Sequence, residues 1–427
     1  MSRRKSQRPE AAENPRTILV RGARQLLTMR GSEGAARGAE MRSLGMIADG
    51  AILIVDGVIQ EVGPSRRVEM LAAAREAEEL DASGRVVMPG FVDCQTHLLA
   101  PPAPLDDYET RCLKGKFPPP EERGHSAMDA VRVMRGYSAQ RLEMEGKRQL
   151  RTMWRYGTTS LGSTSGAGLD DVSELRALRV LDGLDERPVR IVPSFGGALG
   201  VAPEYASRAA EYAAWLCADI LPLLARKKLV HRVDVAVGED GLPEEVAALY
   251  VEAARALGMA VHFRMRGDAS RISPGVMSVS GIRHLSQPVA TLAAEAAVAV
   301  LTPGACFHQG CEEMEPARAL IDAGLAVALS TAYHPEESPT PSMPMVVSLA
   351  CSRSGMTPAE ALVASTINAA HALGVAGDAG SLEVGKSADL LIMNASDYRE
   401  IPLYLGVNPV MMALRRGQVI YPRLESV

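Results

Sequence analysis

The sequence lacks the features that mark membrane, secreted and disulfide-bonded proteins. No apolar run reaches the roughly 20 residues that a membrane-spanning helix needs. No apolar stretch follows the basic residues at the start of the chain, which argues against a secretory signal. The six cysteines are scattered and do not have the spacing of a disulfide framework. We therefore expect a cytoplasmic protein with no membrane partner.

A strong excess of one charge is also missing. The formal net charge is -5, so no general attraction to nucleic acid is expected. Residues 1–16 hold a crowded basic cluster, and their polar, proline-containing composition predicts a disordered tail. At 427 residues, the chain is long enough for one large domain with a smaller one attached.

Short strands are predicted near both ends of the chain. Residues 51–55 and 58–62 are apolar runs joined by Asp56-Gly57, which is a strong hairpin signal. Strand-like runs return at residues 388–393 and 416–421. We therefore predict a small β-sandwich domain built from both termini, at residues 17–85 and 375–427.

Eight short apolar runs alternate with helical stretches in the middle of the chain. The runs are residues 90–94, 158–161, 189–193, 233–237, 259–263, 281–285, 297–301 and 326–330. Helical periodicity marks residues 243–257 and 316–323. This alternation predicts an α/β fold, a (β/α)8 TIM barrel, over residues 86–374. An open doubly wound sheet is the alternative, but no glycine-rich phosphate loop supports it.

Four of the eight histidines fall at or just past predicted strand ends, where such barrels carry their chemistry. They are His97, His262, His284 and His334. A single histidine of this kind is more often a hydrogen-bonded core residue, but four at one mouth favour a site. Imidazoles suit a divalent metal, which lowers the pKa of bound water to about 7. A further cluster of Cys306, His308 and Cys311 has a spacing that matches no standard zinc site.

Longer motifs give the chain a specific resemblance. Residues 89–97 read Pro-Gly-Phe-Val-Asp-Cys-Gln-Thr-His, and residues 165–170 read Ser-Gly-Ala-Gly-Leu-Asp. Residues 366–370 read Thr-Ile-Asn-Ala-Ala, and residues 380–386 read Gly-Ser-Leu-Glu-Val-Gly-Lys. From about residue 17 onward, the chain resembles the amidohydrolase superfamily and, within it, the imidazolonepropionases. The resemblance implies hydrolysis of a cyclic amide C–N bond, from imidazolonepropionate to N-formimidoyl-glutamate in histidine degradation.

The resemblance also implies a metal site, with zinc or iron as a single divalent ion. Its ligands would be His97, His262 and Gln95, where Gln95 replaces the first histidine of the family's His-x-His pair. Ala332 stands where the family has a metal-binding aspartate. Residues 262–265, His-Phe-Arg-Met, replace the family's His-Ala-Asp-Glu. Because amides are poor zinc ligands compared with imidazoles, a site without any metal is the alternative.

The remaining site residues are catalytic and substrate-binding candidates. His284 keeps its family position as a catalytic residue, and His334 lies two residues past Ala332, close enough to turn into the mouth. Arg135 and Ser165 match family positions expected to bind the substrate. Both catalytic carboxylates of the family pattern are missing, so a proton acceptor is not evident from the sequence.

Two classes of function therefore stay open. The first is a hydrolase with a rebuilt or weakened metal site that acts on a small molecule. The second is a non-catalytic relative that binds a small ligand or a partner subunit. The second predicts that Gln95→His together with Ala332→Asp restores metal binding without turnover. A homodimer is expected in both cases, because the family often forms dimers.

Overall fold

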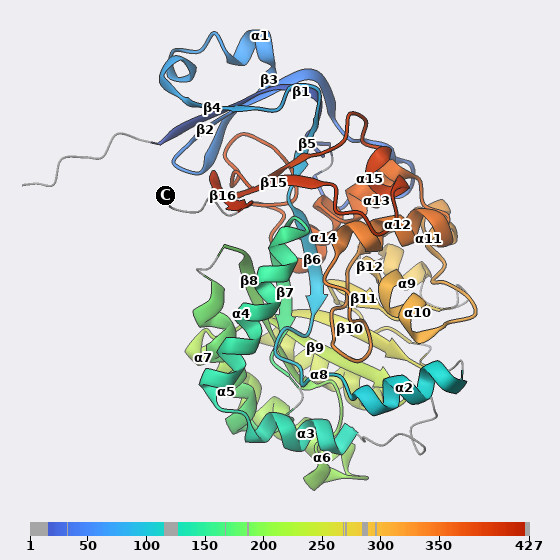
Figure 1. The fold of residues 1–427 in the computed structure, drawn as a ribbon. Helices are drawn as coiled ribbons and strands as arrows, with labels where there is room; N and C mark the ends of the chain where they lie inside the picture. The colour runs from blue at the N-terminus through green and yellow to red at the C-terminus, as the bar shows by residue number, and fades with distance from the viewer. Residues whose placement is uncertain are drawn as a thin grey trace, which may run out of the picture.

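The computed structural model describes residues 16–422, apart from residues 32, 115–126, 167, 186–187, 268, 270, 284–288 and 295–296. His284 and most of the predicted N-terminal tail lie outside the described residues. The described chain forms two sheets, one beside the other, with most of the helices packed around the second (Figure 1).

The first sheet is built from both ends of the chain (Figure 1). Its strand order is β16-β15-β14-β5-β1-β2-β3, with β4 paired to β1. The N-terminal strands are β1 (Thr17–Leu27), β2 (Met46–Val55), β3 (Val58–Pro64), β4 (Glu78–Asp81) and β5 (Val86–Pro89). The C-terminal strands are β14 (Leu390–Met393), β15 (Val410–Arg415) and β16 (Gln418–Tyr421). A β unit made by both termini is therefore confirmed.

The predicted Asp56-Gly57 hairpin joins β2 and β3. Val55 pairs with Val58, and the two turn residues have φ values of 49° and 79°. Two consecutive positive φ values define the tight turn that aspartate and glycine favour. The short helices of this part of the chain are η1 (Gly38–Arg42), α1 (Ser65–Val68) and η2 (Ala72–Glu76).

The second sheet is the predicted parallel barrel. Its strands are β6 (Phe91–Thr96), β7 (Thr158–Thr164), β8 (Arg190–Ala198), β9 (Arg232–Gly238), β10 (Ala260–Arg266), β11 (Ser278–Ser280), β12 (Val298–Leu301) and β13 (Ala326–Leu329). They lie side by side in chain order, and each neighbouring pair is parallel. β6 runs away from the terminal sheet (Figure 1), so the carboxyl ends of the strands face the opposite end of the molecule.

One predicted strand is misplaced. The sixth barrel strand is Ser278–Ser280, whereas residues 281–285 were expected to form it. Gly281 has a φ of 78°, in the left-handed region that glycine adopts readily, and the strand ends before it. The apolar residues that follow Gly281 are therefore not the sixth strand, and the prediction was wrong by about one strand length.

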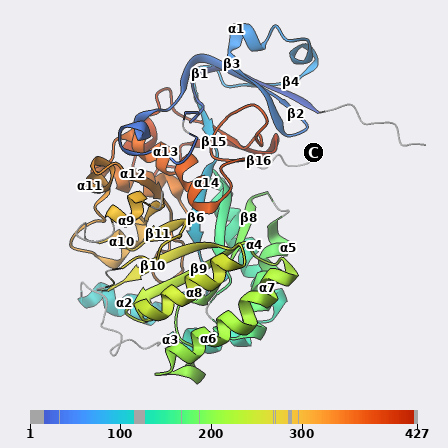
Figure 2. The same cartoon turned by 180° about the vertical axis from the view of Figure 1, so that it is seen from behind.

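Helices surround the barrel and also lie at the end where the strands finish (Figures 1 and 2). They are α2 (Leu105–Lys114), α3 (Ala127–Gly136), α4 (Ala139–Arg155), α5 (Asp171–Asp185), η4 (Pro203–Tyr205), α6 (Ala209–Trp215), η5 (Leu216–Ile220), α7 (Leu221–Lys227), α8 (Glu244–Ala256), α9 (Val289–Ala294), α10 (Pro303–Gln309), α11 (Ala317–Asp322), α12 (Met343–Arg353), α13 (Pro358–Ala364), α14 (Ile367–Leu373) and α15 (Glu400–Leu403). α8 and α11 confirm the two helices that the sequence predicts.

Side chains close the seam between the last strand and the first. Buried Asp93 of β6 accepts hydrogen bonds from the hydroxyls of Ser330 and Thr331 and from the backbone N–H of Thr331 at 3.1 Å. The backbone N–H of His97 donates to the carbonyl oxygen of Tyr333 at 2.7 Å. Burial raises the pKa of Asp93 to about 6, although these hydrogen bonds oppose the rise. The seam thus fixes the residues after β13 against those after β6.

A buried carboxylate joins three helices on the outside of the barrel. Glu360 of α13 accepts a hydrogen bond from Arg42 of η1 at 3.0 Å and is clamped by Arg318 of α11 at 2.9–3.1 Å. It also completes the capping box of α13 with Thr357. Burial opposes ionisation of Glu360, but these hydrogen bonds outweigh it and lower its pKa to about 2.

Replacing this carboxylate should weaken the fold in a pH-dependent way. The folded pKa lies below the unfolded value of about 4.3, so its stabilisation is present above that value and is lost as the pH falls toward 2. We expect Glu360→Gln to lower the free energy of unfolding by about 1–3 kcal/mol at pH 7. Urea unfolding should show that the difference from the parent protein shrinks between pH 5 and pH 2. The matched control is Glu76→Gln, at an exposed position, and a constant difference at every pH would contradict the prediction.

Candidate active site at the barrel mouth

A cavity of about 830 Å³ opens at the carboxyl ends of the barrel strands. Its polar lining includes His97 after β6, Arg264 and Arg266 of β10, and His334 after β13. Loops after β7, β8 and β9 and the helix α3 complete the wall. Two of the four predicted histidines therefore line one mouth, where the sequence places the chemistry.

Strand alternation sends a row of polar side chains into the barrel. His262, Arg264 and Arg266 are two residues apart on β10, so they share the inward face. Arg232 and Asp234 of β9 share the same face, and His262 pairs with Asp234 across the two strands. The sequence placed His262 at a strand end, but β10 continues to Arg266, so His262 lies deep in the barrel and is fully buried.

His262 and Gln95 contact each other. The Nε2 atom of His262 lies 2.8 Å from Oε1 of Gln95 and 3.1 Å from the hydroxyl of Ser280. Its Nδ1 atom lies 2.7 Å from the hydroxyl of Ser278. Burial and the nearby Arg232 hold the pKa of His262 well below its usual value, so the ring is neutral. Both ring nitrogens already have protein partners.

His97 contacts a guanidinium group. Nη1 of Arg264 lies 2.6 Å from Nε2 of His97. Because a guanidinium can only donate, the lone pair of His97 Nε2 accepts this hydrogen bond. Burial and the charge of Arg264 keep the pKa of His97 well below its usual value. The nitrogen that could have bound a metal ion is therefore used by Arg264.

Asp234 anchors this arginine. It pairs with Arg264 and accepts hydrogen bonds from the hydroxyls of Ser194 and Thr164, while Nε of Arg232 lies 3.7 Å away. Asp234 is 1% exposed and Arg264 is 8% exposed. Burial opposes ionisation of Asp234, but the two guanidinium groups outweigh it and hold its pKa well below the usual range. The barrel centre thus holds one carboxylate between two arginines.

His334 is fixed by the backbone that follows it. Its Nδ1 atom accepts from the backbone N–H groups of Glu336 and Glu337, each at 3.3 Å. In the neutral ring the proton is therefore on Nε2. The ring lies edge-on to that of His97, with the centroids 5.3 Å apart. Glu336 and Glu337 line the cavity too, and the sequence does not single them out because they belong to no family motif.

Arg135 and Ser165 hold the loop after β7. Arg135 pairs with Asp170 at 2.7 Å and with Glu204, and it donates to the carbonyl oxygen of Gly168 at 2.8 Å. Ser165 is buried, donates to Glu174 and accepts from the N–H of Gly196 at 3.0 Å. Among the described residues, neither lines the cavity, although Gly166 does. Their roles in substrate binding stay predictions.

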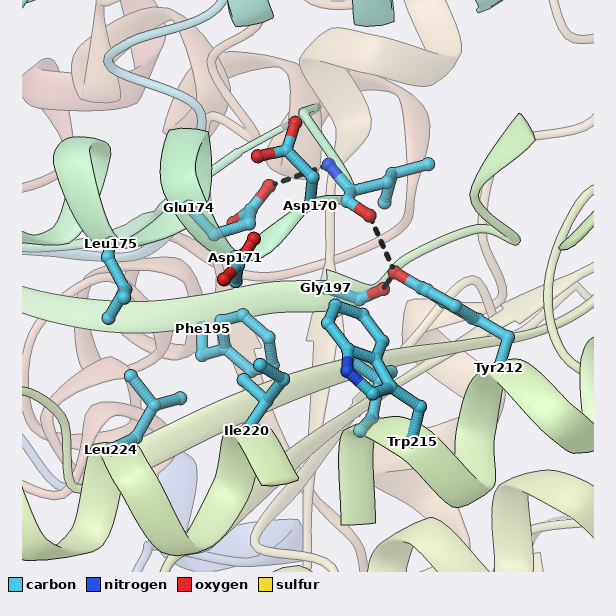
Figure 3. A pocket seen from close by; sticks show the side chains of 12 residues that line it. Asp170, Asp171, Glu174, Leu175, Phe195, Gly197, Tyr212, Trp215, Ile220 and Leu224 are labelled. Atoms are coloured by element: carbon cyan, nitrogen blue, oxygen red, sulfur yellow. Dashed lines mark hydrogen bonds between the residues drawn. The ribbon is translucent and has the colours of Figure 1, made fainter. Parts of the chain in front are cut away.

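A small apolar pocket lies behind this loop (Figure 3). Glu174 of α5 points up to the loop and accepts from the backbone N–H groups of Gly168 and Leu169, each at 3.1 Å. The hydroxyl of Tyr212 donates to the carbonyl oxygen of Gly197 at 2.7 Å and lies 3.3 Å from that of Leu169. Burial raises the pKa of both Glu174 and Tyr212. The buried side chains of Glu174 and Tyr212 thus hold the loop that forms part of the cavity wall.

The residues at the mouth do not fit a divalent metal ion. Gln95 and His262 bond to each other, His97 bonds to Arg264, and Ala332 carries no ligand atom. The described part of the chain holds no group of three histidine, cysteine or carboxylate side chains that could bind one. The cluster around Cys306 is therefore not such a group either, and the thiol of Cys306 donates to the carbonyl oxygen of Glu313. A divalent ion about 4 Å from a guanidinium would be repelled by roughly 8 kcal/mol at an effective dielectric constant of about 20.

Comparisons with known proteins agree with the barrel and its attached sheet. The model of the amidohydrolase family matches residues 203–421. Guanine deaminase of E. coli superposes with a TM-score of 0.66 at 16% identity, covering 96% of this chain and 100% of that chain. An adenosine deaminase from Xanthomonas campestris with bound zinc gives 0.63 at 17% identity, covering 94% and 92%. Identities this low show the fold alone. Together with the match to the family model, that fold defines an amidohydrolase-type barrel protein.

A closer relative narrows this class. The imidazolonepropionase of Chloroflexus aggregans is 36% identical over 423 residues, covering 95% of this chain and 99% of that protein. Others, such as that of Geobacillus kaustophilus, are also 36% identical and cover 95% of this chain. The chain belongs to the amidohydrolase family and is an imidazolonepropionase-like member of it.

Removing the charge of Asp234 should strongly destabilise the barrel. Asp234→Asn leaves two buried guanidinium groups without a counter-ion, so we expect a loss of about 3–5 kcal/mol in the free energy of unfolding. Asp240→Asn, at an exposed position in the loop after β9, is the matched control and should stay within about 0.5 kcal/mol. Denaturant unfolding measures both. Equal losses in the two variants would contradict the role of Asp234.

Ala332 is in a conformation that alanine adopts poorly. Its φ is 47°, in the left-handed region. We expect Ala332→Gly to raise the free energy of unfolding by about 1 kcal/mol, because glycine removes the steric strain at this φ. Ala248→Gly, at an exposed position within α8, should instead lower it by about 1 kcal/mol. Thermal unfolding should give shifts of opposite sign, and a loss of stability in both variants would show that Ala332 is unstrained.

Proposed function

We propose that this chain hydrolyses the ring C–N bond of a small cyclic amide of the imidazolonepropionate class, bound in the mouth of the barrel. The observation that carries the proposal is 36% identity to an imidazolonepropionase over nearly the whole of both chains. The cavity at the strand ends supports the proposal, because enzymes with this barrel fold have their active sites at this face. A small molecule is therefore the proposed partner.

In this proposal Arg264 meets the ring carbonyl oxygen. The oxygen of water adds to the carbonyl carbon, the ring C–N bond breaks, and the nitrogen leaves with a proton. Negative charge develops on the carbonyl oxygen as water adds, and a fixed cation beside that oxygen stabilises it. Arg264 is already held in place by Asp234 and Thr164, so its charge needs no rearrangement.

Two kinds of side chain at the mouth supply the proton transfers. Glu336 and Glu337 carry carboxylates that can accept the proton of the attacking water. His334 carries its proton on Nε2, because Nδ1 accepts from the backbone, and this N–H can donate to the leaving nitrogen. His284 stays a predicted catalytic residue, outside the described part of the chain.

Other expectations belong to the proposal as well. A cytoplasmic location remains a prediction from the sequence composition, and a homodimer remains a prediction that follows from the resemblance. Among the helices of the described residues, none is both long and apolar enough to cross a membrane. Zinc or iron, the ion expected from the family, has no complete set of ligands among the described residues.

A second candidate function is a non-catalytic ligand-binding protein. The specific observation in its favour is the mutual pairing of His262 and Gln95, together with Ala332 at the family's aspartate position. These replacements leave a mouth that keeps donors for an oxygen-bearing ligand. In this case the cavity holds a cyclic amide or a related carboxylate without changing it.

Turnover of imidazolonepropionate by untagged protein separates the two candidates. Mass spectrometry should follow the gain of one water, and Arg264→Met should lower the rate by about 100- to 1,000-fold. Glu312→Gln, at an exposed position, is the control and should keep the parent rate. Circular dichroism should confirm that both variants are folded.

Calorimetric binding completes the experiment. Binding of imidazolonepropionate without turnover would support the ligand-binding candidate and exclude the hydrolase. Absence of both binding and turnover would contradict both candidates for this ligand class. Turnover that is insensitive to Arg264→Met would keep the hydrolase but remove the role assigned to Arg264.

A further inference from the structure

A buried guanidinium, that of Arg264, lies at the mouth beside a histidine that the resemblance assigns to a metal. His97, which the resemblance assigns to a metal, lies 2.6 Å from Nη1 of Arg264. Nη2 of the same group contacts Asp234 and donates to Thr164 at 3.0 Å. The group is therefore bound on two sides by the imidazole and carboxylate of the barrel centre.

We propose that the guanidinium of Arg264 takes the place of the divalent metal ion, so that this barrel carries a cation of its own and binds its ligand without a metal. The positive charge comes with the polypeptide and is present as soon as the chain folds. The ligand class follows from the donor chemistry: a molecule that brings a carbonyl or carboxylate oxygen to N–H groups.

The contacts of Arg264 leave no ligand set for a metal ion. A metal at this position would need the lone pair of His97, which accepts from Arg264. The carboxylate of Asp234 is likewise unavailable to a metal, because it is shared by Arg264 and Arg232. The barrel centre already has two guanidinium groups against that single carboxylate, so an added divalent ion would meet uncompensated positive charge.

Arg264 also keeps unused donor capacity. Its Nε–H is buried and has no hydrogen-bond partner among the described residues. Buried N–H groups are usually paired, and an unpaired one calls for a missing acceptor. A ligand oxygen, or a water molecule that bridges to it, is an acceptor of the right kind, whereas a metal ion is not.

At position 332 the side chain differs from that of the family, but the backbone conformation still suits the family's aspartate. Its φ of 47° is a conformation that aspartate tolerates better than alanine does. The frame that would present a carboxylate is thus kept, while the carboxylate itself is gone. Ala332→Asp should therefore restore a carboxylate at this position without a change of backbone conformation.

Metal content of the parent protein is the first test. Untagged protein should be produced in medium supplemented with zinc and iron and measured by inductively coupled plasma mass spectrometry. We expect below about 0.1 ion per chain, and no rise in melting temperature when zinc chloride is added, because an ion that bound the folded state would raise it. One tightly held ion per chain, retained through gel filtration, would overturn the proposal.

Matched variants test the guanidinium itself. Gln95→His with Ala332→Asp restores two ligands but keeps Arg264. Because Arg264 still contacts His97, we expect this variant to stay metal-free, in contrast to the sequence-based expectation that it binds a metal. Adding Arg264→Asp to these two changes should give about one zinc per chain and a melting temperature that rises with zinc chloride. Zinc binding by the double variant would show that missing ligands, and not Arg264, exclude the metal. If the triple variant does not fold, Arg264→Met with the same two changes replaces it.

This inference rests on the proposed function in one respect: it assigns Arg264 as the cation that the ligand meets. The outcomes of the experiment distinguish failure of the inference from failure of the proposed function. Metal-free protein that turns over imidazolonepropionate in the presence of a chelator supports both. Metal-free protein without turnover keeps the inference and removes the hydrolase. Protein with one ion per chain and chelator-sensitive turnover keeps the hydrolase and overturns the inference.

Discussion

The mouth of this barrel depends on one buried ion pair, that of Asp234 with Arg264. The pair crosses from β9 to β10 and brings the hydroxyls of Thr164 and Ser194 with it. Burial of either charge alone would be strongly unfavourable, so each fixes the position of the other. Because Arg264 then contacts His97, the same pair also sets which nitrogen of that imidazole carries the proton.

The fold was largely predictable, since alternating strands and helices and an Asp-Gly hairpin are local patterns. The barrel and the sheet from both termini are confirmed, and α8 and α11 lie where the periodicity places them. The sixth strand was misplaced because Ile282 and Leu285 suggest a strand, whereas the strand Ser278–Ser280 has only one apolar residue and the φ of Gly281 is not visible in the sequence. The tightness of that turn depends on packing that no local pattern encodes.

The site was predictable only in part. Strand alternation places His262 and Arg264 on the inward face, but the sequence presents Arg264 as the loss of a family aspartate. What this arginine does depends on Asp234, 30 residues earlier, and on the register that pairs His262 with Asp234. Glu336 and Glu337 were missed for a similar reason, because their approach to the cavity depends on how His334 binds the backbone after it.

The replaced residues are best understood as one coupled change. Carboxylates that bind a divalent ion in a buried site would be uncompensated if the ion left. Arginine at 264 and alanine at 332, where the family has aspartates, remove two negative charges and add one positive charge at the same place. A barrel that had lost its metal ion without compensating substitutions would keep unpaired buried carboxylates at this place. Here Asp234 is paired with two arginines, and Asp93 accepts hydrogen bonds from two hydroxyls. The balance of charge therefore argues for a mouth rebuilt around a guanidinium.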